Sequence, residues 1–213
     1  MTTSDALSAD KLRADVDPAI VGREIVVVDE TTSTNDSVLE RTSPSTPEGL
    51  VVFAERQTAG RGQRSNFWES ADRKGLWFSF LLRPKIDIRN SPHLAEWAAR
   101  TVAGTISKEF GLAATVKLPN DVIVAGKKIA GALVEMRAQR NAPHIAIIGI
   151  GVNVNHQPED FSEELRPRAI SLAMALDRSA TRRIRRGEQV DRHQLAVALL
   201  QNLDASYRDR FAE

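Results

Sequence analysis

Short apolar runs separated by polar and glycine-rich breaks are the feature that most constrains how this chain can fold. The runs are rich in valine, isoleucine and phenylalanine, which is typical of strands. They occupy residues 24–30, 50–57, 75–84, 114–138 and 144–155. The fourth run alternates apolar and polar residues on both sides of Ala125-Gly126, which indicates a hairpin. The pattern therefore predicts adjacent strands in a mostly antiparallel or mixed sheet.

Other segments follow helical spacing. Ser91-Pro92 supplies an N-cap and a first-turn proline, and Gly111 ends the segment. The apolar residues that recur every four positions in the two longest segments are Leu94, Ala98, Val102, Ile106 and Phe110, then Leu195, Leu199, Leu203, Tyr207 and Phe211. A further helix is expected after the capping residues 31–36. We expect an α+β fold, a central mostly antiparallel or mixed sheet flanked by helices.

Composition favours one ordinary globular domain. The chain has 213 residues and a formal net charge of +1, so any anion binding must be local. The absence of cysteine excludes disulfides, thiolate catalysis and cysteine metal sites. Residues 1–20 are polar and acidic, unlike a signal peptide, and no apolar run is long enough to span a bilayer. We expect a cytoplasmic protein with a loose lead-in over residues 1–20 and one domain over residues 21–213.

The stretch QTAGRGQRSNFW, residues 57–68, indicates an anion site. Gly60 and Gly62 let backbone N–H groups approach a ligand, and Arg61 and Arg64 carry forked donors suited to phosphate or carboxylate. A flexible loop without a ligand has the same composition, so both interpretations stay open on these residues alone. The two aromatic residues that end the stretch either anchor the loop or stack on a planar ring.

A second polar cluster lies within residues 114–138. KLPND and GKKIAG place lysines, an amide and a carboxylate on neighbouring strands and the hairpin between them. Asp121 suits a magnesium ion, Asn120 a base edge or a metal-bound water, and Lys128 the charge of a phosphoryl group. An ordinary hairpin with exposed lysines has the same residues, so this segment alone leaves both interpretations open.

Several common motifs are absent. GKKI lacks the earlier glycine and the serine or threonine of a P-loop, and GIGVNVN lacks the third glycine of a dinucleotide fingerprint. The histidines are isolated in the sequence, and no serine has the flanking glycines of a nucleophile elbow. Six arginines between Arg178 and Arg192 are expected to form a solvated connector rather than a nucleic-acid arm.

Four blocks, taken in order, resemble biotin protein ligases, the enzymes that attach biotin to a lysine of carboxylase carrier domains. They are STN at 33–35, ERQTAGRGQRSNFW at 55–68, KLPNDVIVAGKKIAGALVE at 117–135 and GIGVNVN at 149–155. The resemblance implies the class II aminoacyl-tRNA synthetase-like fold of biotin and lipoate ligases. Some relatives also have an N-terminal winged helix-turn-helix that binds DNA, and we expect none here because nothing before Val21 is long enough to form one. The catalytic domain of the family is normally followed by a small C-terminal β domain, and we expect that domain to be absent because nothing after Phe211 could supply it.

The resemblance also implies roles for individual residues. The implied biotin-binding residues are Ser33, Thr34, Asn35, Gln57, Arg61, Gly62, Gln63, Lys128 and Gly131, of which the first four bond the ureido ring. The implied nucleotide-binding residues are Arg64, Trp68, Lys117, Asn120 and Asn153, and the implied magnesium ligand is Asp121. Arg61 and Lys128 are the implied catalytic residues, which would stabilise phosphoryl charge.

The implied reaction uses ATP to convert biotin to biotinyl-5′-AMP, releases pyrophosphate and then transfers biotin to a carrier lysine. Biotin, ATP and magnesium are the expected ligands, and the expected partner is the biotin carboxyl carrier domain of acyl-CoA or pyruvate carboxylases. Neither nucleic acid nor a membrane is an expected partner. The sequence departs from the family at Gln63 and Ser65, which replace an arginine and a glycine. It also departs at Leu118, which replaces a tryptophan and is expected to keep its apolar packing.

Two alternatives stay open. Lipoate ligases resemble the same fold and activate a carboxylate in the same way. A non-catalytic nucleic-acid module would use GRGQR and the arginine-rich connector as basic contacts. The net charge of +1 and the 5% aromatic content argue against the nucleic-acid module.

Overall fold

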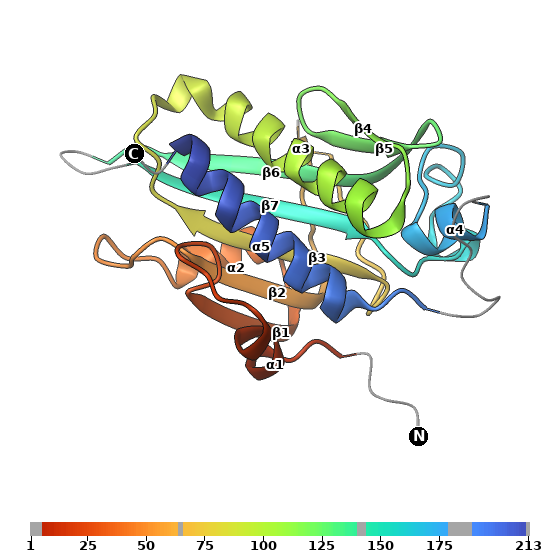
Figure 1. The fold of residues 1–213 in the computed structure, drawn as a ribbon, viewed down its shortest axis with the longest axis horizontal. Coiled ribbons are helices and arrows are strands. Elements are labelled where there is room, and N and C mark those ends of the chain that lie inside the picture. Colours follow the sequence, from red (N-terminus) through yellow and green to blue (C-terminus); the bar gives the residue numbers. More distant parts are fainter. Residues whose placement is uncertain (1–5, 64–65, 140–143, 179–188, 212–213) are drawn as a thin grey trace.

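A mixed sheet with helices on both faces forms the framework of the chain (Figure 1). The structure is a computed structural model, and it describes residues 6–63, 66–139, 144–178 and 189–211. Within these residues the sheet has seven strands, in the order β1 (Glu24–Thr31), β2 (Leu50–Gln57), β3 (Gly75–Leu82), β7 (Ile145–Asn153), β6 (Lys127–Arg137), β5 (Asp121–Val124) and β4 (Ala114–Lys117). β1 and β2 are parallel, and the other neighbours are antiparallel. The predicted mixed, mostly antiparallel sheet is confirmed.

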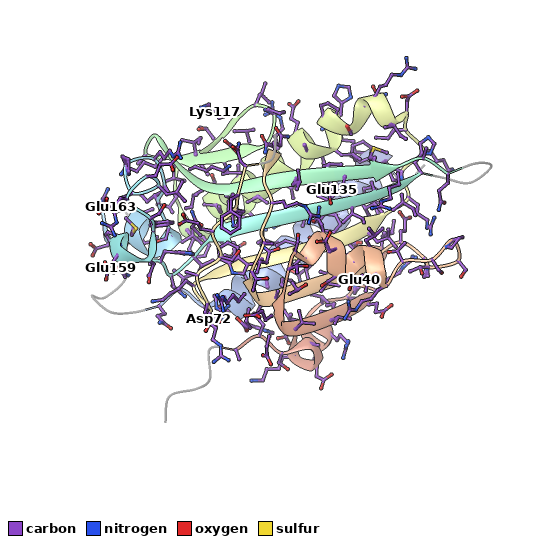
Figure 2. The ribbon with its side chains drawn as sticks, turned by 180° about the vertical axis from the view of Figure 1, so that it is seen from behind. Glu40, Asp72, Lys117, Glu135, Glu159 and Glu163 are labelled. Atoms are coloured by element: carbon purple, nitrogen blue, oxygen red, sulfur yellow. The ribbon has the colours of Figure 1, made fainter. Side chains whose placement is uncertain are left out.

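The predicted helices flank this sheet. α3 (Ser91–Phe110) and α5 (Arg192–Phe211) cross one face, and α2 (Thr34–Glu40) lies on the other (Figures 1 and 2). α3 ends at Gly111, whose φ of 67° is left-handed, as the sequence predicts, but its N-cap is Asn90 rather than Ser91. The shorter elements are α1 (Ala9–Asp15), α4 (Leu172–Asp177) and the 3-10 turns Ile88–Asn90 and Pro158–Asp160. None of the helices described has the length and hydropathy needed to cross a bilayer.

Alternation along the strands gives the two faces of the sheet different chemistry. In β3, Leu76, Phe78 and Phe80 point into the main core beneath α3 and α5. The intervening Trp77 and Ser79 point to the opposite face, because successive side chains of a strand alternate. The α2 face has a smaller apolar cluster, formed by Val38, Leu50, Val52, Leu81, Ile145 and Ile147. The α2 face therefore leaves room for polar groups beside that cluster.

Glycines open the sheet surface next to α2. Gly131 of β6 and Gly151 of β7 are partners across the two strands, and Gly149 lies two residues away on the same face. A Cβ atom on Gly151 would lie 2.5 Å from Cε2 of Trp68, and one on Gly149 would overlap the side chain of Asn35. Glycine is therefore required where these two side chains approach the backbone.

The segment predicted as a loose lead-in, residues 1–20, is folded in its described part. α1 begins after the N-cap Ser8, and the side chain of Leu12 is fully buried. The N–H groups of residues 19–21 donate to the carboxylate of Asp204 in α5 at 2.7–3.1 Å. The prediction is wrong for these residues because their anchor, Asp204, lies at the far end of the sequence.

One arginine of the expected solvated connector is in fact buried. Arg192, at the start of α5, is fully buried, and its Nη1 lies 2.7 Å from Oε2 of Glu55 in β2. The same Nη1 donates to the carbonyl of Gly75 at 3.2 Å. Residues 179–188 of the connector lie outside the described residues. The expectation is therefore wrong for Arg192, which fixes α5 to the sheet.

Candidate functional site

Residues from distant segments meet on the α2 face of the sheet. They line a narrow pocket of about 40 Å³, which we call the polar pocket. Its lining comes from the start of α2, from β2 and the following loop, from the turn before β5, from β6 and from β7: Ser33, Thr34, Asn35, Gln57, Arg61, Gly62, Gln63, Trp68, Asn120, Lys128, Gly131, Ala132, Leu133, Gly149, Ile150 and Gly151. All the residues that the resemblance assigns to biotin are among them.

The start of α2 presents three small polar residues to this pocket. Ser33 has extended backbone dihedrals (φ −155°, ψ 140°) as the N-cap, and helix geometry begins at Thr34. Ser33, Thr34 and Asn35 are all buried. Because buried polar groups are costly unless they are hydrogen-bonded, these side chains need specific partners.

A chain of hydrogen bonds supplies partners for Thr34 and Asn35. Oε1 of Gln57 accepts from the N–H of Thr34 at 2.8 Å and lies 3.1 Å from its Oγ1. Oγ of Ser79 lies 2.6 Å from Oγ1 of Thr34 and donates to Oδ1 of Asn35 at 2.6 Å. Nδ2 of Asn35 then donates to Oε2 of Glu135 at 2.7 Å. The two ends of the Asn35 amide are thus fixed by a donor on one side and an acceptor on the other.

Ser79 and Glu135 are not among the site residues predicted from the sequence. Ser79 is completely buried in β3 and is the one polar residue in the run 75–82, which is the signal that identifies it in retrospect. Glu135 ends the third family block but carries no pattern of its own. Its importance depends on the pairing of β6 with β7, which places it beside the start of α2.

Arg61, implied as catalytic, is paired with two carboxylates. Its Nη1 and Nη2 each lie 2.7 Å from an oxygen of Asp36, and Nη2 lies 3.2 Å from Oε2 of Glu135. The hydrogen bond from Arg61 lowers the pKa of the Asp36 carboxyl, and the same bond raises the pKa of Arg61. The guanidinium is therefore anchored at the edge of the polar pocket by partly exposed ion pairs.

Trp68 anchors the end of the segment that follows β2, residues 58–68, which we call the glycine-rich loop. Its ring lies against Gly131 and Gly151, and the ammonium of Lys128 lies 5.1 Å from the ring centroid. The backbone N–H of Trp68 donates to the carbonyl of Gly60 at 2.9 Å, which closes the base of the loop. Phe67 is 63% exposed, so of the two aromatics that end the stretch only Trp68 acts as an anchor among the described residues.

A wider cavity of about 570 Å³, which we call the outer cavity, adjoins the polar pocket. Trp68 and Lys128 line both spaces. The other lining residues are Asn66, Phe67, Glu69, Ala71, Lys117, Asp121, Ile123, Gly126, Asn153, His156, Asp160, Phe161, Ser162, Glu164, Leu165, Arg168 and Ala169. Lys117, Asp121 and Asn153, implied at the nucleotide and its metal, therefore lie in one space with Trp68.

The polar residues between the two spaces are held by named partners. Nζ of Lys128 lies 2.6 Å from Oδ1 of Asp121, and the backbone of Lys128 bonds to the segment at Arg168 and Ile170. Nδ2 of Asn120 donates to the carbonyl of Ala132 at 2.9 Å. Asn120 lines the polar pocket rather than the outer cavity.

Four predicted positions remain: Arg64 and Ser65 in the loop, Asn153 at the end of β7 and Leu118 in the block KLPND. Arg64, implied at the nucleotide, and Ser65, one of the departures from the family, lie outside the described residues. Asn153 is buried and donates to the carbonyl of Ile170 at 3.2 Å. Leu118 was expected to keep apolar packing, but it is 61% exposed, so that prediction is wrong. The chain turns between β4 and β5 at this point, and the turn directs Leu118 outward.

An aromatic wall bounds the outer cavity and was not predicted. The ring of His156 stacks on Phe161 at 4.9 Å and meets the edge of Trp77 at 5.6 Å. His156 is buried, and burial lowers its pKa to about 4. No histidine spacing reveals this role, because the neighbours come from β3 and from the turn after β7.

Comparison with known proteins agrees with this geometry. The profile of the biotin/lipoate A/B protein ligase family matches residues 27–153. The chain is 36% identical over 203 residues to the bifunctional ligase/repressor BirA of Bacillus subtilis, covering 95% of this chain and 59% of that protein. It is 31% identical over 188 residues to the biotin–[acetyl-CoA-carboxylase] ligase of Mycobacterium tuberculosis, covering 86% and 64%. The chain thus spans about three fifths of these relatives.

The fold is also found in a solved structure. The biotin protein ligase from Aquifex aeolicus, in complex with biotin and ATP, superposes with a TM-score of 0.70 and 26% identity. The match covers 88% of this chain and 73% of that chain. The predicted class, a mixed sheet with flanking helices in the class II synthetase-like fold, is therefore confirmed.

Proposed function

This chain belongs to the biotin/lipoate A/B protein ligase family, and we propose that it is a biotin protein ligase. The observation that carries the proposal is the convergence of Ser33, Gln57 and Lys128 in one pocket, although they lie on three separate elements. Relatives from Bacillus subtilis and Mycobacterium tuberculosis that are named as ligases support it.

The polar pocket suits the ureido ring of biotin. A ureido group has two N–H donors and one carbonyl acceptor, so it needs both acceptors and donors from the protein. Asn35 and Gln57 each carry both kinds of atom on one amide, and Ser33 adds a hydroxyl. The narrow shape of the pocket beside three glycines favours a thin, flat group over a bulky one.

The outer cavity suits the nucleotide. Its volume of about 570 Å³ lies in the range of small-molecule sites, and Trp68 and Phe161 offer aromatic faces to a planar base. Lys117 and Arg168 add positive charge for phosphates. The ring of biotin and the base of ATP would thus occupy separate spaces that meet at Trp68 and Lys128.

The first reaction step joins these two ligands. A carboxylate oxygen of biotin forms a bond to the α-phosphorus of ATP, and the bond from that phosphorus to the bridging oxygen breaks as pyrophosphate leaves. Lys128, placed where the two spaces meet, would stabilise the developing phosphoryl charge. Arg61 would join it after exchanging a carboxylate partner for a phosphate. No nucleophilic side chain is required.

The second step consumes the mixed anhydride. The amine of a carrier lysine bonds to the acyl carbon, the carbon–oxygen bond to AMP breaks, and the amine loses a proton. Water would hydrolyse the same anhydride, so a glycine-rich loop that closes over it would protect it. The proposed acceptor is the biotin carboxyl carrier domain of an acyl-CoA or pyruvate carboxylase.

Magnesium fits this site only together with the nucleotide. Among the described residues no group of three or more His, Cys, Asp or Glu side chains could hold a metal ion. Mg²⁺ commonly binds through one or two carboxylates, substrate phosphates and water. Asp121 in the outer cavity would supply the carboxylate, and the ion would neutralise phosphate charge.

The decisive experiment is labelling of an unmodified carrier domain with biotin, ATP and magnesium, with release of pyrophosphate followed in parallel. We expect labelled carrier, and formation of biotinyl-5′-AMP when the carrier is omitted. Absence of the adenylate would refute the proposal. Calorimetry with biotin and with lipoate tests the related activity, and tighter binding of lipoate would reassign the chain to lipoate ligation.

A further inference from the structure

The carboxylate of Glu135 contacts both the polar pocket and the glycine-rich loop. Its Oε2 accepts from Nδ2 of Asn35 at 2.7 Å and from Nη2 of Arg61 at 3.2 Å, and its Oε1 lies 3.4 Å from the same Nη2. Figure 2 shows Glu135 on the sheet face that carries α2. One carboxylate thus joins a residue at the proposed ring site to a residue at the proposed phosphate site.

The hydrogen bonds that lead to Glu135 run in one direction. Asn35 accepts at Oδ1 from the hydroxyl of Ser79, which has a single proton to give. Ser79 must therefore accept from the hydroxyl of Thr34, 2.6 Å away. Nδ2 of Asn35 then needs an acceptor, and Glu135 supplies it. The orientation of the Asn35 amide consequently depends on the chemistry at position 135.

On the side of the glycine-rich loop, Glu135 takes part in ion pairs with Arg61. Arg61 spans two carboxylates, with both Asp36 oxygens at 2.7 Å and Glu135 at 3.2 Å. The three side chains are between 34% and 40% exposed, so water screens their attraction. A ligand phosphate can therefore exchange with one of the carboxylates without a large energetic cost.

We propose that Glu135 is a positioning residue that couples the two halves of the site, an inference that rests on the proposed function. Its carboxylate orients the amide of Asn35 for the ureido ring and retains Arg61 beside the pocket. When a ring draws Nδ2 of Asn35 away, the carboxylate loses a donor and its hold on Arg61 changes. The affinities for biotin and for nucleotide therefore depend on each other through Glu135.

Two substitutions separate the parts of this role. Glu135→Gln keeps an oxygen for Asn35 but removes the negative charge that faces Arg61. Glu135→Ala removes both contacts. The matched control is Glu30→Gln, because Glu30 also pairs with an arginine, Arg56 at 2.9 Å, on the neighbouring strands β1 and β2 and away from the pocket.

The coupling is measured by calorimetry of biotin with and without a non-hydrolysable ATP analogue. We expect the analogue to change biotin affinity about fivefold or more in the unmodified protein. In Glu135→Gln this ratio should approach one, whereas biotin affinity alone changes little. Glu135→Ala should weaken biotin about tenfold or more even without nucleotide. Glu30→Gln should match the unmodified protein.

An unchanged ratio of biotin affinities with and without the analogue in Glu135→Gln would overturn the proposal. A merely structural residue behaves in that way, because its loss lowers both affinities by the same factor. This outcome differs from failure of the proposed function, in which the unmodified protein binds neither biotin nor the analogue.

A ligand-free measurement tests the Arg61 contact by itself. Trypsin must bind the side chain of Arg61 to cleave the chain after it. The carboxylates of Asp36 and Glu135 compete for that side chain and therefore slow the cleavage. We expect Glu135→Gln to raise the rate of this cut about two- to fivefold and Glu30→Gln to leave it unchanged. Equal rates in both variants would show that Glu135 does not retain the loop.

Discussion

The two faces of the sheet use ion pairs in opposite ways. On the face beneath α3 and α5, Arg192 and Glu55 form a pair whose side chains are 0% and 2% exposed. On the α2 face, Arg61 pairs with Asp36 and Lys128 pairs with Asp121, and these side chains keep between 27% and 37% of their exposure. The distances are alike, at 2.6 to 2.7 Å.

Burial decides what such a pair can do. A buried pair has no water to replace a lost partner, so it cannot exchange and it holds the fold in place. A partly exposed pair contributes little stability and is easily exchanged. The pairs on the α2 face therefore hold Arg61 and Lys128 near their proposed ligand sites but still allow them to exchange partners. The buried pair on the core face instead holds α5 and the sheet together.

The largest effect is expected from breaking the buried pair. Arg192→Ala leaves the carboxylate of Glu55 buried without its charged partner, and should lower the free energy of unfolding by about 3–5 kcal/mol. Chemical denaturation measures this loss. Arg56→Ala, which removes the exposed pair with Glu30, should cost about 1 kcal/mol or less. Similar losses for both variants would show that burial does not distinguish the pairs.

A pH titration of stability tests whether water is excluded from His156, which packs against Trp77, as it is from the core. Burial lowers the pKa of His156 to about 4, below its ordinary value of 6.5, against a smaller opposing effect of Asp160. The unfolded chain binds the proton more readily, so stability should fall as pH drops from 6.5 to 4, by on the order of 3 kcal/mol. His156→Phe keeps an aromatic ring and should remove this part of the slope. The same slope in both proteins would contradict the assignment.

Removing the cation where the two spaces meet should affect chemistry more than folding. Lys128→Ala should slow adenylate formation about 10²-fold, because an electrostatic stabiliser of the phosphoryl charge is lost. Pyrophosphate release measures the rate, and denaturation checks the fold. The neighbouring Lys127, whose Nζ donates to the carbonyl of Arg166, is the control, and Lys127→Ala should leave the rate close to normal. An unchanged rate in Lys128→Ala would place this lysine outside the reaction.

The smallest effects are expected from a pair of glycine substitutions. Gly151→Ala places a Cβ atom 2.5 Å from Cε2 of Trp68, so the ring must move. We expect the free energy of unfolding to fall by about 1–3 kcal/mol. Tryptophan fluorescence should change and biotin should bind more weakly. Gly104→Ala lies in α3, where an added Cβ meets nothing within 4 Å, and should stabilise the protein by about 0.5–1 kcal/mol. A stabilising Gly151→Ala would show that Trp68 does not need the glycine surface.

Most of the framework follows from local pattern. The apolar runs became β1 to β7, and the hairpin at Ala125-Gly126 turns with positive φ at both residues. The helix ended by Gly111 follows its spacing closely. Period-two and period-four patterns succeed because each reports which face of an element is buried.

The site could be predicted only as a set of residues. The family blocks identified Ser33, Gln57 and Lys128, which do share a pocket. The blocks did not reveal that Ser79 and Glu135 complete the hydrogen-bond chain, or that His156 stacks on Phe161. These contacts join residues that are far apart in sequence or carry no recurring pattern.

The sequence by itself determined the strands, the long helices, the glycine-rich loop and the family, because each depends on neighbouring residues or ordered blocks. Tertiary structure alone decided that Arg192 is buried against Glu55 and that Arg61 rests on Asp36 and Glu135. Both choices follow from strand order and helix placement, which set how much water reaches each charge. An arginine in the sequence does not show whether it will be a fixed support or an exchangeable cation, because that depends on its solvent exposure in the fold.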